Sequence, residues 1–198
     1  TGKPFRIGVW EDDKYIGVVF FGSGASAALG MPYDLTTFQV CELVRVALNN
    51  NHKSAVTRII SVAIRMLKKE CPGLRLVVSF ADPCQGHHGG IYQGGNWIYT
   101  GDSSPSYMWR LPDGSLAHDR RFSGSGWNAP KTPPKGSIKI KVPGKHRYLM
   151  PLDEEMRKRI LPLSKPYPKR VSSEKVSRST SVESKRCNTD SDAPTVLQ

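Results

Sequence analysis

The sequence predicts an α/β (α+β) fold, in which a mixed central sheet is joined by one long crossover helix and a short second helix. The main observation lies in residues 39–80, where an apolar strand-like run, an amphipathic helical pattern and a second apolar run follow one another. Such a unit forms a right-handed crossover between parallel strands. With 198 residues the chain is long enough to bury one core. One domain followed by a tail is therefore expected.

The N-terminal residues predict an antiparallel hairpin and then a loop. Residues 5–10 and 15–21 are rich in aromatic and β-branched side chains, and the acidic and polar residues 11–14 between them suit a turn. Small residues and glycines fill positions 22–30, which leaves few side chains to pack. A hairpin followed by a loop is expected here.

The crossover unit has clear boundaries. Residues 39–48 carry apolar side chains on both faces, as is typical of a strand covered on both sides. The polar run 49–53 predicts a turn, and Ser54 is the expected N-cap of the helix. One apolar stripe defines the helix before Pro72-Gly73 ends it, and this stripe consists of Val56, Ile59, Ile60, Ala63 and Leu67. Residues 74–80 predict the second buried strand.

The rest of the chain predicts shorter elements. They are a glycine-weakened helix at 88–98, strands at 107–111 and 115–118 around a Pro-Asp-Gly turn, a strand at 146–152 and a helix at 153–161. Irregular structure is expected from about 123 to 144, where Gly, Ser, Pro and Lys are frequent. We expect a catalytic core at 1–122, a basic extension at 123–170 that packs on or beside it, and a disordered tail at 171–198.

The charge of the chain predicts a polyanionic partner. The formal net charge is +12 and the sequence pI about 9.7. From Lys131 to Arg170 there are twelve Lys or Arg against three acidic residues, and the aromatic side chains of Tyr148 and Tyr167 are interleaved with them, with Trp127 just before. Phosphate neutralisation and base stacking use such residues, so we expect DNA or RNA as a partner. A basic stretch that only keeps the chain soluble is the alternative.

No run of residues is long and apolar enough to cross a membrane, and no signal peptide pattern opens the chain, so we expect a cytoplasmic protein without a membrane partner. The four cysteines have no regular spacing, and reduced thiols are expected; they are Cys41, Cys71, Cys84 and Cys187.

The turn before the long helix is a candidate anion site. Backbone N–H groups at a helix N-terminus point toward a bound phosphate, and His52 and Lys53 add hydrogen-bond donors. An ordinary turn between a strand and a helix is the alternative, because every such unit has one. The usual glycine-rich phosphate-binding pattern is absent from this turn.

A second candidate site begins at the carboxyl end of the strand at 74–80. Ligand sites of open α/β sheets lie at such strand ends, and the reactive side chains here are Ser79, Asp82, Cys84, His87, His88, Tyr92, Asn96 and Tyr99. Cys84, His87 and His88 are candidate metal ligands together with Asp82. The alternatives are that the histidines serve as acid or base, contact DNA or cap a helix. A plain strand-ending turn followed by a loop is the alternative for the whole segment.

These motifs resemble those of a known family. The order of elements resembles the GNAT acyltransferase fold from its second strand onward. Within that fold, the run SFADP…GHHGGIYQGGNWIYTG, the Tyr/Trp strand with its PDG turn and the later KHRYLMPL resemble the phage Mom family. The resemblance covers about residues 5–169. It departs from the fold's pattern in the turn without glycines and in the absence of the fold's first strand and helices.

The resemblance implies an enzyme of bacteriophage DNA modification. It would convert adenine to N6-carbamoylmethyladenine with acetyl-coenzyme A as donor, and so protect phage DNA from restriction in the host cytoplasm. An iron requirement is also implied. Backbone groups of Val46, Ala47 and Leu48 would hold the pantetheine arm of the coenzyme. The turn formed by His52, Lys53, Ser54 and Ala55 would hold its pyrophosphate.

The resemblance also implies roles for the second site. Tyr92 or Tyr99, both expected on the short helix, would protonate the leaving thiolate. Asp82 with His87 or His88 would activate the acceptor, and Ser79 belongs to the same catalytic set. The DNA-contacting residues would be Arg45, Lys139, Lys141, Lys145, Arg147 and Trp109.

An adenine amino group is hidden in a duplex, so the base has to be flipped out or single-stranded. The aromatic side chains to test for stacking on it are Trp97, Tyr107, Trp109 and Trp127. Two other functions stay open, an acetyltransferase acting on protein or small amines and a non-catalytic DNA-binding protein. The sequence also leaves open whether the protein is a monomer or a dimer.

Overall fold

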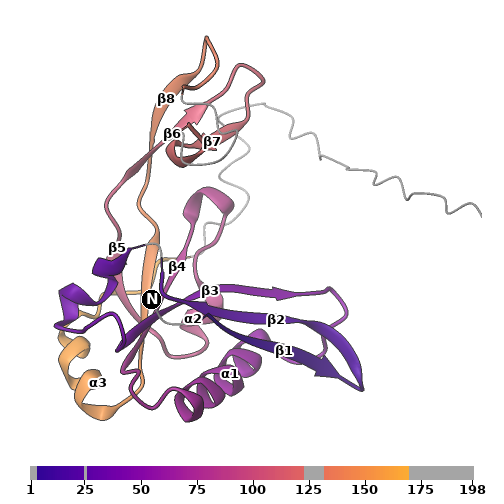
Figure 1. Ribbon diagram of the computed structural model, residues 1–198, viewed down its shortest axis with the longest axis vertical. Helices are drawn as coiled ribbons and strands as arrows, with labels where there is room; N and C mark the ends of the chain where they lie inside the picture. Colours follow the sequence, from indigo (N-terminus) through magenta and orange to yellow (C-terminus); the bar gives the residue numbers. More distant parts are fainter. Residues whose placement is uncertain (1–3, 25, 123–131, 170–198) are drawn as a thin grey trace, which may run out of the picture. The chain divides into compact units, whose positions relative to one another are not determined.

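A six-stranded mixed sheet forms the centre of the protein, and its strands lie in the order β1-β2-β3-β4-β9-β5 (Figure 1). The computed structural model describes residues 4–24, 26–122 and 132–169. The strands of this sheet are β1 (Phe5–Glu11), β2 (Lys14–Gly22), β3 (Val40–Leu48), β4 (Leu76–Ala81), β5 (Ile98–Asp102) and β9 (His146–Pro151). All pairs are antiparallel except β3 and β4.

The predicted N-terminal hairpin is confirmed. β1 and β2 are antiparallel and joined through Asp12 and Asp13, whose φ angles of 49° and 59° belong to the left-handed region that tight hairpin turns use. The predicted loop after β2 is only partly confirmed, because residues Ala27–Tyr33 form a 3-10 helix, η1. Its N-cap is Ser26, whose hydroxyl accepts a hydrogen bond from the Ala28 N–H.

The long crossover helix is α1 (Val56–Glu70), and β3 and β4 on either side of it are parallel, as predicted. Its apolar stripe packs against one face of the sheet, with Ile60, Ala63 and Leu67 buried among residues of β2, β3 and β4. The predicted N-cap was wrong: Ala55 holds that position and makes no side-chain hydrogen bond. None of the described helices is long and apolar enough to span a membrane.

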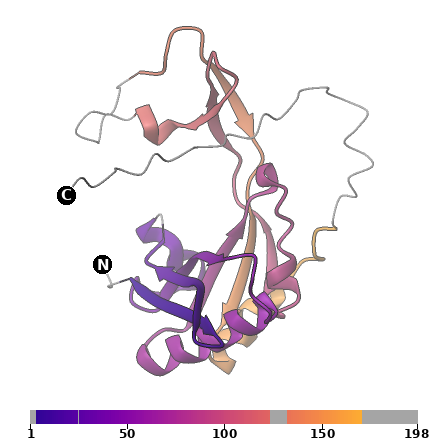
Figure 2. The ribbon, with the colours of Figure 1, turned by 90° about the vertical axis from the view of Figure 1, so that its right-hand side faces the viewer.

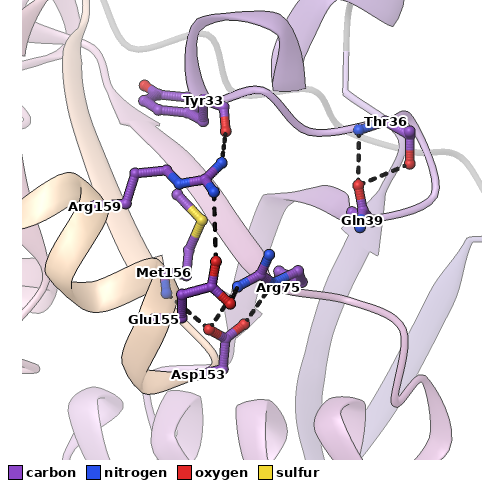
Figure 3. Close-up of polar contacts among 8 residues, drawn as sticks. All are labelled: Tyr33, Thr36, Gln39, Arg75, Asp153, Glu155, Met156 and Arg159. Carbon is purple, nitrogen blue, oxygen red and sulfur yellow. Dashed lines mark hydrogen bonds and ion pairs between the residues drawn. The ribbon is translucent and has the colours of Figure 1, made fainter.

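The other face of the sheet is covered by η1 and by α3 (Glu154–Ile160), whose Met156 and Ile160 are fully buried. Figure 3 shows the polar contacts that fix α3 beside β4. Asp153 caps α3 by accepting from the Met156 N–H at 2.7 Å, and it also accepts two hydrogen bonds of 2.9 Å from the Arg75 guanidinium. Arg159 donates to the Tyr33 carbonyl and so joins α3 to η1. The predicted helix at 153–161 is confirmed.

The parallel pairing of β3 with β4 is short. It extends from Val40 opposite Leu76 to Glu42 opposite Val78, while β3 continues to Leu48 paired with β2. Among the described residues, the second half of β3 therefore has a strand on one side only. The two parallel strands separate at this point, and the separation opens the sheet toward the start of α1.

A β-bulge shifts the side chains of β3. The register with β2 slips by one residue at Val44, and bulges re-aim the side chains that follow them. Leu43 and Val46 consequently pack in the same core cluster beneath α1. Plain alternation along a strand would place these two residues on opposite faces, so the strand expected at 39–48 is present but its alternation is interrupted after Leu43.

A second, three-stranded antiparallel sheet is inserted in the chain between β5 and β9. It consists of β6 (Ser106–Arg110), β7 (Leu116–His118) and β8 (Ile138–Val142). The short 3-10 helix η3 (Asp119–Phe122) follows β7 in the chain. The predicted strands around the Pro-Asp-Gly turn are confirmed as β6 and β7. The irregular structure expected up to residue 144 was wrong at β8, where Ile138, Ile140 and Val142 alternate with two lysines.

Residues of the expected basic extension also build the main sheet. β9, predicted as a strand, lies between β4 and β5, and its Tyr148 and Leu149 are fully buried. The short helix expected at 88–98 is restricted to α2 (Gly90–Gln93), because the glycines of this segment give little helix propensity. The mixed sheet with one long crossover helix and a short second helix confirms the predicted fold class.

Candidate active site

A cavity of about 620 Å³ opens where β3 and β4 separate. Its walls come from β3, the start of α1, the end of β4 and the segment that leads into α2, and Figure 2 shows the ribbon of this part of the protein turned by 90° from Figure 1. The lining residues are Val46, Leu48, His52, Val56, Phe80, Ala81, Gly86, His87, His88, Gly89, Gly90, Ile91 and Tyr92. The two segments selected from the sequence, at 46–55 and at 79–92, thus meet at one cavity.

Along this cavity the second half of β3 has no second neighbouring strand in the part of the chain that the structure describes. Asn49 donates its N–H to the Ile16 carbonyl of the β2 side. In an antiparallel ladder both backbone groups of alternate residues point at the partner strand, so Ala47 also faces β2. The N–H and C=O groups of Val46 and Leu48 then face the gap. Of the three residues expected to hold a coenzyme arm, Val46 and Leu48 line the cavity and Ala47 does not.

The turn before α1 already holds a carboxylate of this chain. Glu11, at the end of β1, accepts hydrogen bonds from the Lys53 N–H at 2.7 Å and the Ser54 N–H at 2.9 Å. These backbone hydrogen bonds lower the pKa of Glu11 to about 2. The Lys53 ammonium pairs with Asp12. Two of the amides expected to bind pyrophosphate are therefore occupied, while no side chain caps the first turn of α1 at Ala55.

Ser79 and Tyr92 form a buried hydrogen-bonded chain beside the cavity. The Ser79 hydroxyl lies 2.8 Å from the Leu43 carbonyl oxygen and 2.8 Å from the Tyr92 hydroxyl. Ser79 has one proton and a carbonyl can only accept, so Ser79 donates to Leu43 and accepts from Tyr92. Burial raises the pKa of Tyr92, which keeps the phenol protonated at neutral pH. Ser79 also joins β4 to β3 directly after their ladder ends.

Tyr148 holds the histidine-containing loop in place. Its hydroxyl donates to the His88 carbonyl at 2.7 Å and also accepts from the Gln93 amide. Its ring stacks on Tyr92 with 4.9 Å between centroids. Gly89, with φ at +81°, lies directly against the Tyr148 ring, where any side chain would collide. The backbone of this loop is thus fixed, and His88 is one of the residues that line the cavity.

Asp82 is held by hydrogen bonds and an ion pair, whereas His87 is exposed at the cavity. Asp82 caps the short 3-10 helix η2 (Pro83–Gln85) by accepting from the Cys84 N–H, and it pairs with Lys145 at 3.1 Å. His87 is exposed and lines the cavity mouth. No group of three or more His, Cys, Asp or Glu side chains in the described part of the chain converges as metal ligands. Cys84, His87 and His88 therefore do not form the expected metal site.

Tyr99 lies on β5 and not on the short helix where it was expected. Its hydroxyl donates to Asp102 at 2.7 Å, and the same carboxylate oxygen lies 2.6 Å from Nδ1 of His146 on β9. Burial raises the pKa of Tyr99, and its hydrogen bond to Asp102 adds to the effect. Burial opposes ionisation of Asp102, but hydrogen bonds from Tyr99 and His146 outweigh it and lower the pKa of the carboxyl.

The expected DNA-contacting residues divide into two groups. Lys139 and Lys141 of β8 lie opposite Trp109 and Tyr107 of β6, on one face of the small sheet, and the Lys139 ammonium sits over both rings. The Trp109 indole N–H donates to Asp119.

The other expected contacts lie on the main sheet. Arg45 is exposed on β3, Lys145 pairs with Asp82, and Arg147 donates to Thr100. Trp97 is 1% exposed and belongs to the core. Trp127 lies outside the described residues.

The structure adds site residues that the sequence did not single out. Glu11 and Tyr148 each hydrogen-bond to a predicted site residue of another segment. Asp102 accepts from Tyr99 within β5, and His146 of β9 contacts Asp102 and the Tyr99 ring. His146 and Tyr148 are two apart on one strand, so period-two alternation could have placed them on the same face. No local pattern marks Glu11 or Asp102.

Comparison with known proteins identifies the family. The solved structures that match include a Bacillus subtilis acetyltransferase in complex with CoA, with 15% sequence identity and a TM-score of 0.42, over 74% of this chain and 76% of that chain. Comparison with curated proteins gives no match. The Mom protein family matches residues 1–169, which is most of the sequence. The chain therefore belongs to the Mom protein family.

Proposed function

We propose that this protein is an acyl-coenzyme-A-dependent transferase that modifies adenine in phage DNA and thereby protects it from restriction in the host cytoplasm. The observation that carries the proposal is the cavity beside the unpaired edge of β3, which follows directly from the separation of β3 and β4. An extended ligand can hydrogen-bond to such an edge as an added strand would. The volume of the cavity, about 620 Å³, lies within the range of ordinary ligand and cofactor sites.

The pantetheine arm of acetyl-coenzyme A supplies the extended amide groups that this edge requires. We propose that it pairs with the backbone of Val46 and Leu48, whose polar groups face the gap. The phosphates would then lie at the start of α1, where Val56 lines the cavity and the first-turn amides carry no side-chain cap. Glu11 stands beside this position, so the phosphates must displace it or bind next to it.

The thioester would lie at the inner end of the cavity, near Tyr92. This phenol is protonated at neutral pH and is a proton donor for the leaving thiolate, once it turns from Ser79. The acceptor would enter between the loop with His87 and His88 and the ends of β4 and β9. An adenine has to leave its helix to reach this place.

The basic face of the small sheet suits the DNA backbone. Lys139, which also pairs with Asp119 at 3.4 Å, and Lys141 lie beside Tyr107, which is 49% exposed, and Trp109. Cations with adjacent aromatic rings neutralise phosphates and stack on unpaired bases. Trp109 is committed to Asp119, so we propose Tyr107 as the stacking side chain and the lysines as phosphate contacts.

Mass spectrometry of nucleosides tests the function directly. DNA from cells that express the whole chain is digested, and deoxyadenosine derivatives are compared with those from cells expressing a Tyr92→Phe variant. The acetyl group carries no nitrogen, and its methyl carbon would have to lose two electrons to bond to the adenine nitrogen, so an amine donor and an oxidant both have to join the reaction if the carbamoylmethyl product forms. The mass of the added group therefore distinguishes a carbamoylmethyl product from an acetyl product. Unmodified deoxyadenosine in both samples would refute the proposal.

Coenzyme binding is measured separately. A ligand at one hundred times its Kd stabilises a protein by about 2.7 kcal/mol, so acetyl-coenzyme A should raise the melting temperature clearly. Adenosine 3′,5′-bisphosphate lacks the pantetheine arm and serves as the matched control. If both ligands act equally, the edge of β3 does not bind the arm. If neither ligand raises the melting temperature, the result favours the alternative of a DNA-binding protein that does not use this coenzyme.

A further inference from the structure

We propose that the face of the main sheet turned away from α1 binds a single-stranded segment of DNA, with Phe80 stacking on the extruded adenine at the cavity. This inference rests on the proposed function and names the surface that presents the substrate. It is carried by alternating arginine and phenylalanine side chains across the sheet, which we call the Arg–Phe row. Its members are Arg6, Phe20, Arg45, Phe80 and Arg147.

The first three members of the row are neighbours on three adjacent strands. Arg6 of β1 pairs with Phe20 of β2, and Phe20 pairs in turn with Arg45 of β3. Residues directly opposite each other in antiparallel strands share one face, with Cβ atoms about 5 Å apart. The Arg6 guanidinium lies over the Phe20 ring, 5.4 Å from its centroid. The bulge at Val44 brings Arg45 to this place, because Val44 would otherwise stand opposite Phe20.

The other two members lie across the opening in the sheet. Phe80 of β4 pairs with Arg147 of β9, whose Nε donates to the Thr100 hydroxyl at 2.9 Å. Phe80 packs against the core cluster under η1 and α3, whereas Ala81, the next residue, belongs to the cluster under α1. Phe80 therefore projects from the face turned away from α1.

Both halves of the row lie on this one face. Ile7 and Val19, which are chain neighbours of Arg6 and Phe20, pack in the cluster beneath α1. Alternation along a strand turns Arg6 and Phe20 to the opposite face, and Arg45 shares that face as the partner of Phe20. Arg6 and Arg45 are exposed, and the other members of the row are partly buried.

The row lies beyond the part of this face that η1 and α3 cover. These helices pack over Val78 and Leu149, which pair with each other, and Phe80 with Arg147 is the next pair on the same face of the ladder. Glu42 also stands on this face, beside Gly24. Its single negative charge is outweighed by the three arginines of the row.

The cavity connects this face with the coenzyme side. Phe80 lines the cavity from the face of the Arg–Phe row, and Val56 and Tyr92 line it from the face covered by α1. The coenzyme and the base can therefore approach from opposite faces of the sheet. The Phe80 ring offers a flat apolar surface to a base that enters here, and enzymes hold flipped bases against such side chains.

The chemistry of the row fits an unpaired strand. Guanidinium groups neutralise phosphates, and the aromatic rings between them offer stacking surfaces that every base can use. Arg6 and Arg45 are two strand spacings apart, about 10 Å, with the Phe20 ring between them. Paired bases keep their faces inside the helix stack, so the rings require bases that are unpaired or extruded. Aromatic side chains on a sheet bind single-stranded RNA in the same manner.

Binding of single-stranded DNA tests the row without coenzyme or modification activity. The probe is a fluorescein-labelled oligonucleotide of about 12 nucleotides, thymidines with one central adenosine, measured by fluorescence anisotropy. Phe80→Leu keeps an apolar side chain but loses the ring, so we expect it to weaken binding by about 5- to 150-fold, which corresponds to about 1–3 kcal/mol for one stacked base. Phe80→Tyr keeps a ring and should bind almost as the wild type does. Phe5→Leu, on the α1 face of β1, is the matched control and should not weaken binding.

The arginines are tested through the salt dependence of this binding. Arg6→Gln with Arg45→Gln should reduce the slope of log affinity against log salt by about 1.4, because each phosphate contact on a single strand contributes about 0.7. Arg58→Gln with Arg65→Gln removes the same charge from the exposed side of α1 and should leave the slope unchanged. An equal reduction by both pairs would show that net charge, and not the row, binds the strand, and would overturn the proposal.

Ultraviolet cross-linking locates the bases on the wild-type protein, so its result does not depend on how any variant folds. Irradiation joins a stacked base to the aromatic ring beneath it, and mass spectrometry identifies the peptide that carries the base. We expect cross-links in the peptides that contain Phe20 and Phe80. Cross-links confined to Tyr107 on the small sheet would overturn the proposal.

The outcomes separate this inference from the proposed function. If the wild type modifies DNA while Phe80→Leu and the Arg6 and Arg45 variants bind the single strand as the wild type does, the row is not the DNA surface and the function stands. If the wild type binds the strand through the row but neither binds acetyl-coenzyme A nor modifies DNA, the function fails and the surface stands.

Discussion

Removing the Ser79 hydroxyl tests the point where the sheet opens. Ser79 is fully buried, and it links β4 to the Leu43 carbonyl of β3 while accepting from Tyr92. In Ser79→Ala, both the Leu43 carbonyl and the Tyr92 hydroxyl lose a partner in a place that water does not reach. We therefore expect this small change to be more costly than its loss of one oxygen suggests.

The magnitude follows from the two orphaned groups. A buried polar group left without its partner costs about 1–3 kcal/mol, whereas a satisfied hydrogen bond contributes only about 1 kcal/mol net. We expect Ser79→Ala to lower the free energy of unfolding by about 2–6 kcal/mol for the two groups together, and the melting temperature by roughly 4–24 °C for a chain of this size. Tyr92→Phe removes one of the two contacts and should cost less, about 0.5–1.5 kcal/mol.

Urea denaturation of the two single variants and the double variant provides the measurement. Because Tyr92 loses its partner in Ser79→Ala, the second substitution should add less in that background, with a coupling of about 0.5–1.5 kcal/mol. Ser61→Ala is the matched control on the exposed side of α1 and should change stability by under about 0.5 kcal/mol. Additive effects of Ser79→Ala and Tyr92→Phe, or a loss equal to that of Ser61→Ala, would refute the reasoning.

Four further predictions follow from other contacts. Glu11→Gln removes the charge that occupies the turn before α1, so it should tighten acetyl-coenzyme A binding in calorimetry, and weaker or equal binding would place the phosphates elsewhere. Hydrogen bonds from Arg75 lower the pKa of Asp153 to about 2, so its stabilisation is present above its usual value of 3.8 and is lost as the pH falls toward 2. Asp153→Asn keeps a good helix cap but should flatten the acid unfolding curve in that range, and an unchanged curve would exclude the ion pair as its cause. Lys139→Ala with Lys141→Ala should reduce the salt dependence of DNA binding by a slope of about 1–2, unlike Lys69→Ala with Lys158→Ala, and equal slopes for the two pairs would contradict the basic face. Asp102→Asn should lower the melting temperature more than Tyr99→Phe, because Asp102 contacts both Tyr99 and His146 whereas Tyr99→Phe leaves the contact with His146 in place, and the reverse order in thermal denaturation would contradict this reasoning.

The elements that the sequence predicted well are those with strong local periodicity. The stripe of α1 and the apolar runs of β3 and β4 identify the crossover unit, because a helix and a buried strand each impose their own spacing on apolar residues. The hairpin of β1 and β2 and the helix α3 depend on neighbours within a few residues. Such features need no knowledge of the rest of the chain.

The errors have physical causes as well. β8 is five residues long and flanked by Pro, Gly and Lys, so its alternation was hidden by its surroundings. The N-cap at Ser54 looked suitable, but Ser54 donates its N–H to a carboxylate from β1, and the helix has Ala55 at its N-cap position, one residue later. The metal set at Cys84, His87 and His88 was close in sequence only. Closeness along the chain does not direct side chains to a common point.

The sequence by itself determined the family, the crossover unit and the two segments that meet at the cavity, because each is written in contiguous residues. Only the tertiary structure decided how the site is built. The bulges at Val44 and Gly101 reverse the faces of β3 and β5, and the partners of Ser54 and His146 lie 43 and 44 residues away along the chain. Contacts over such distances depend on strand order and register, which result from the packing of the whole core and which no local pattern specifies.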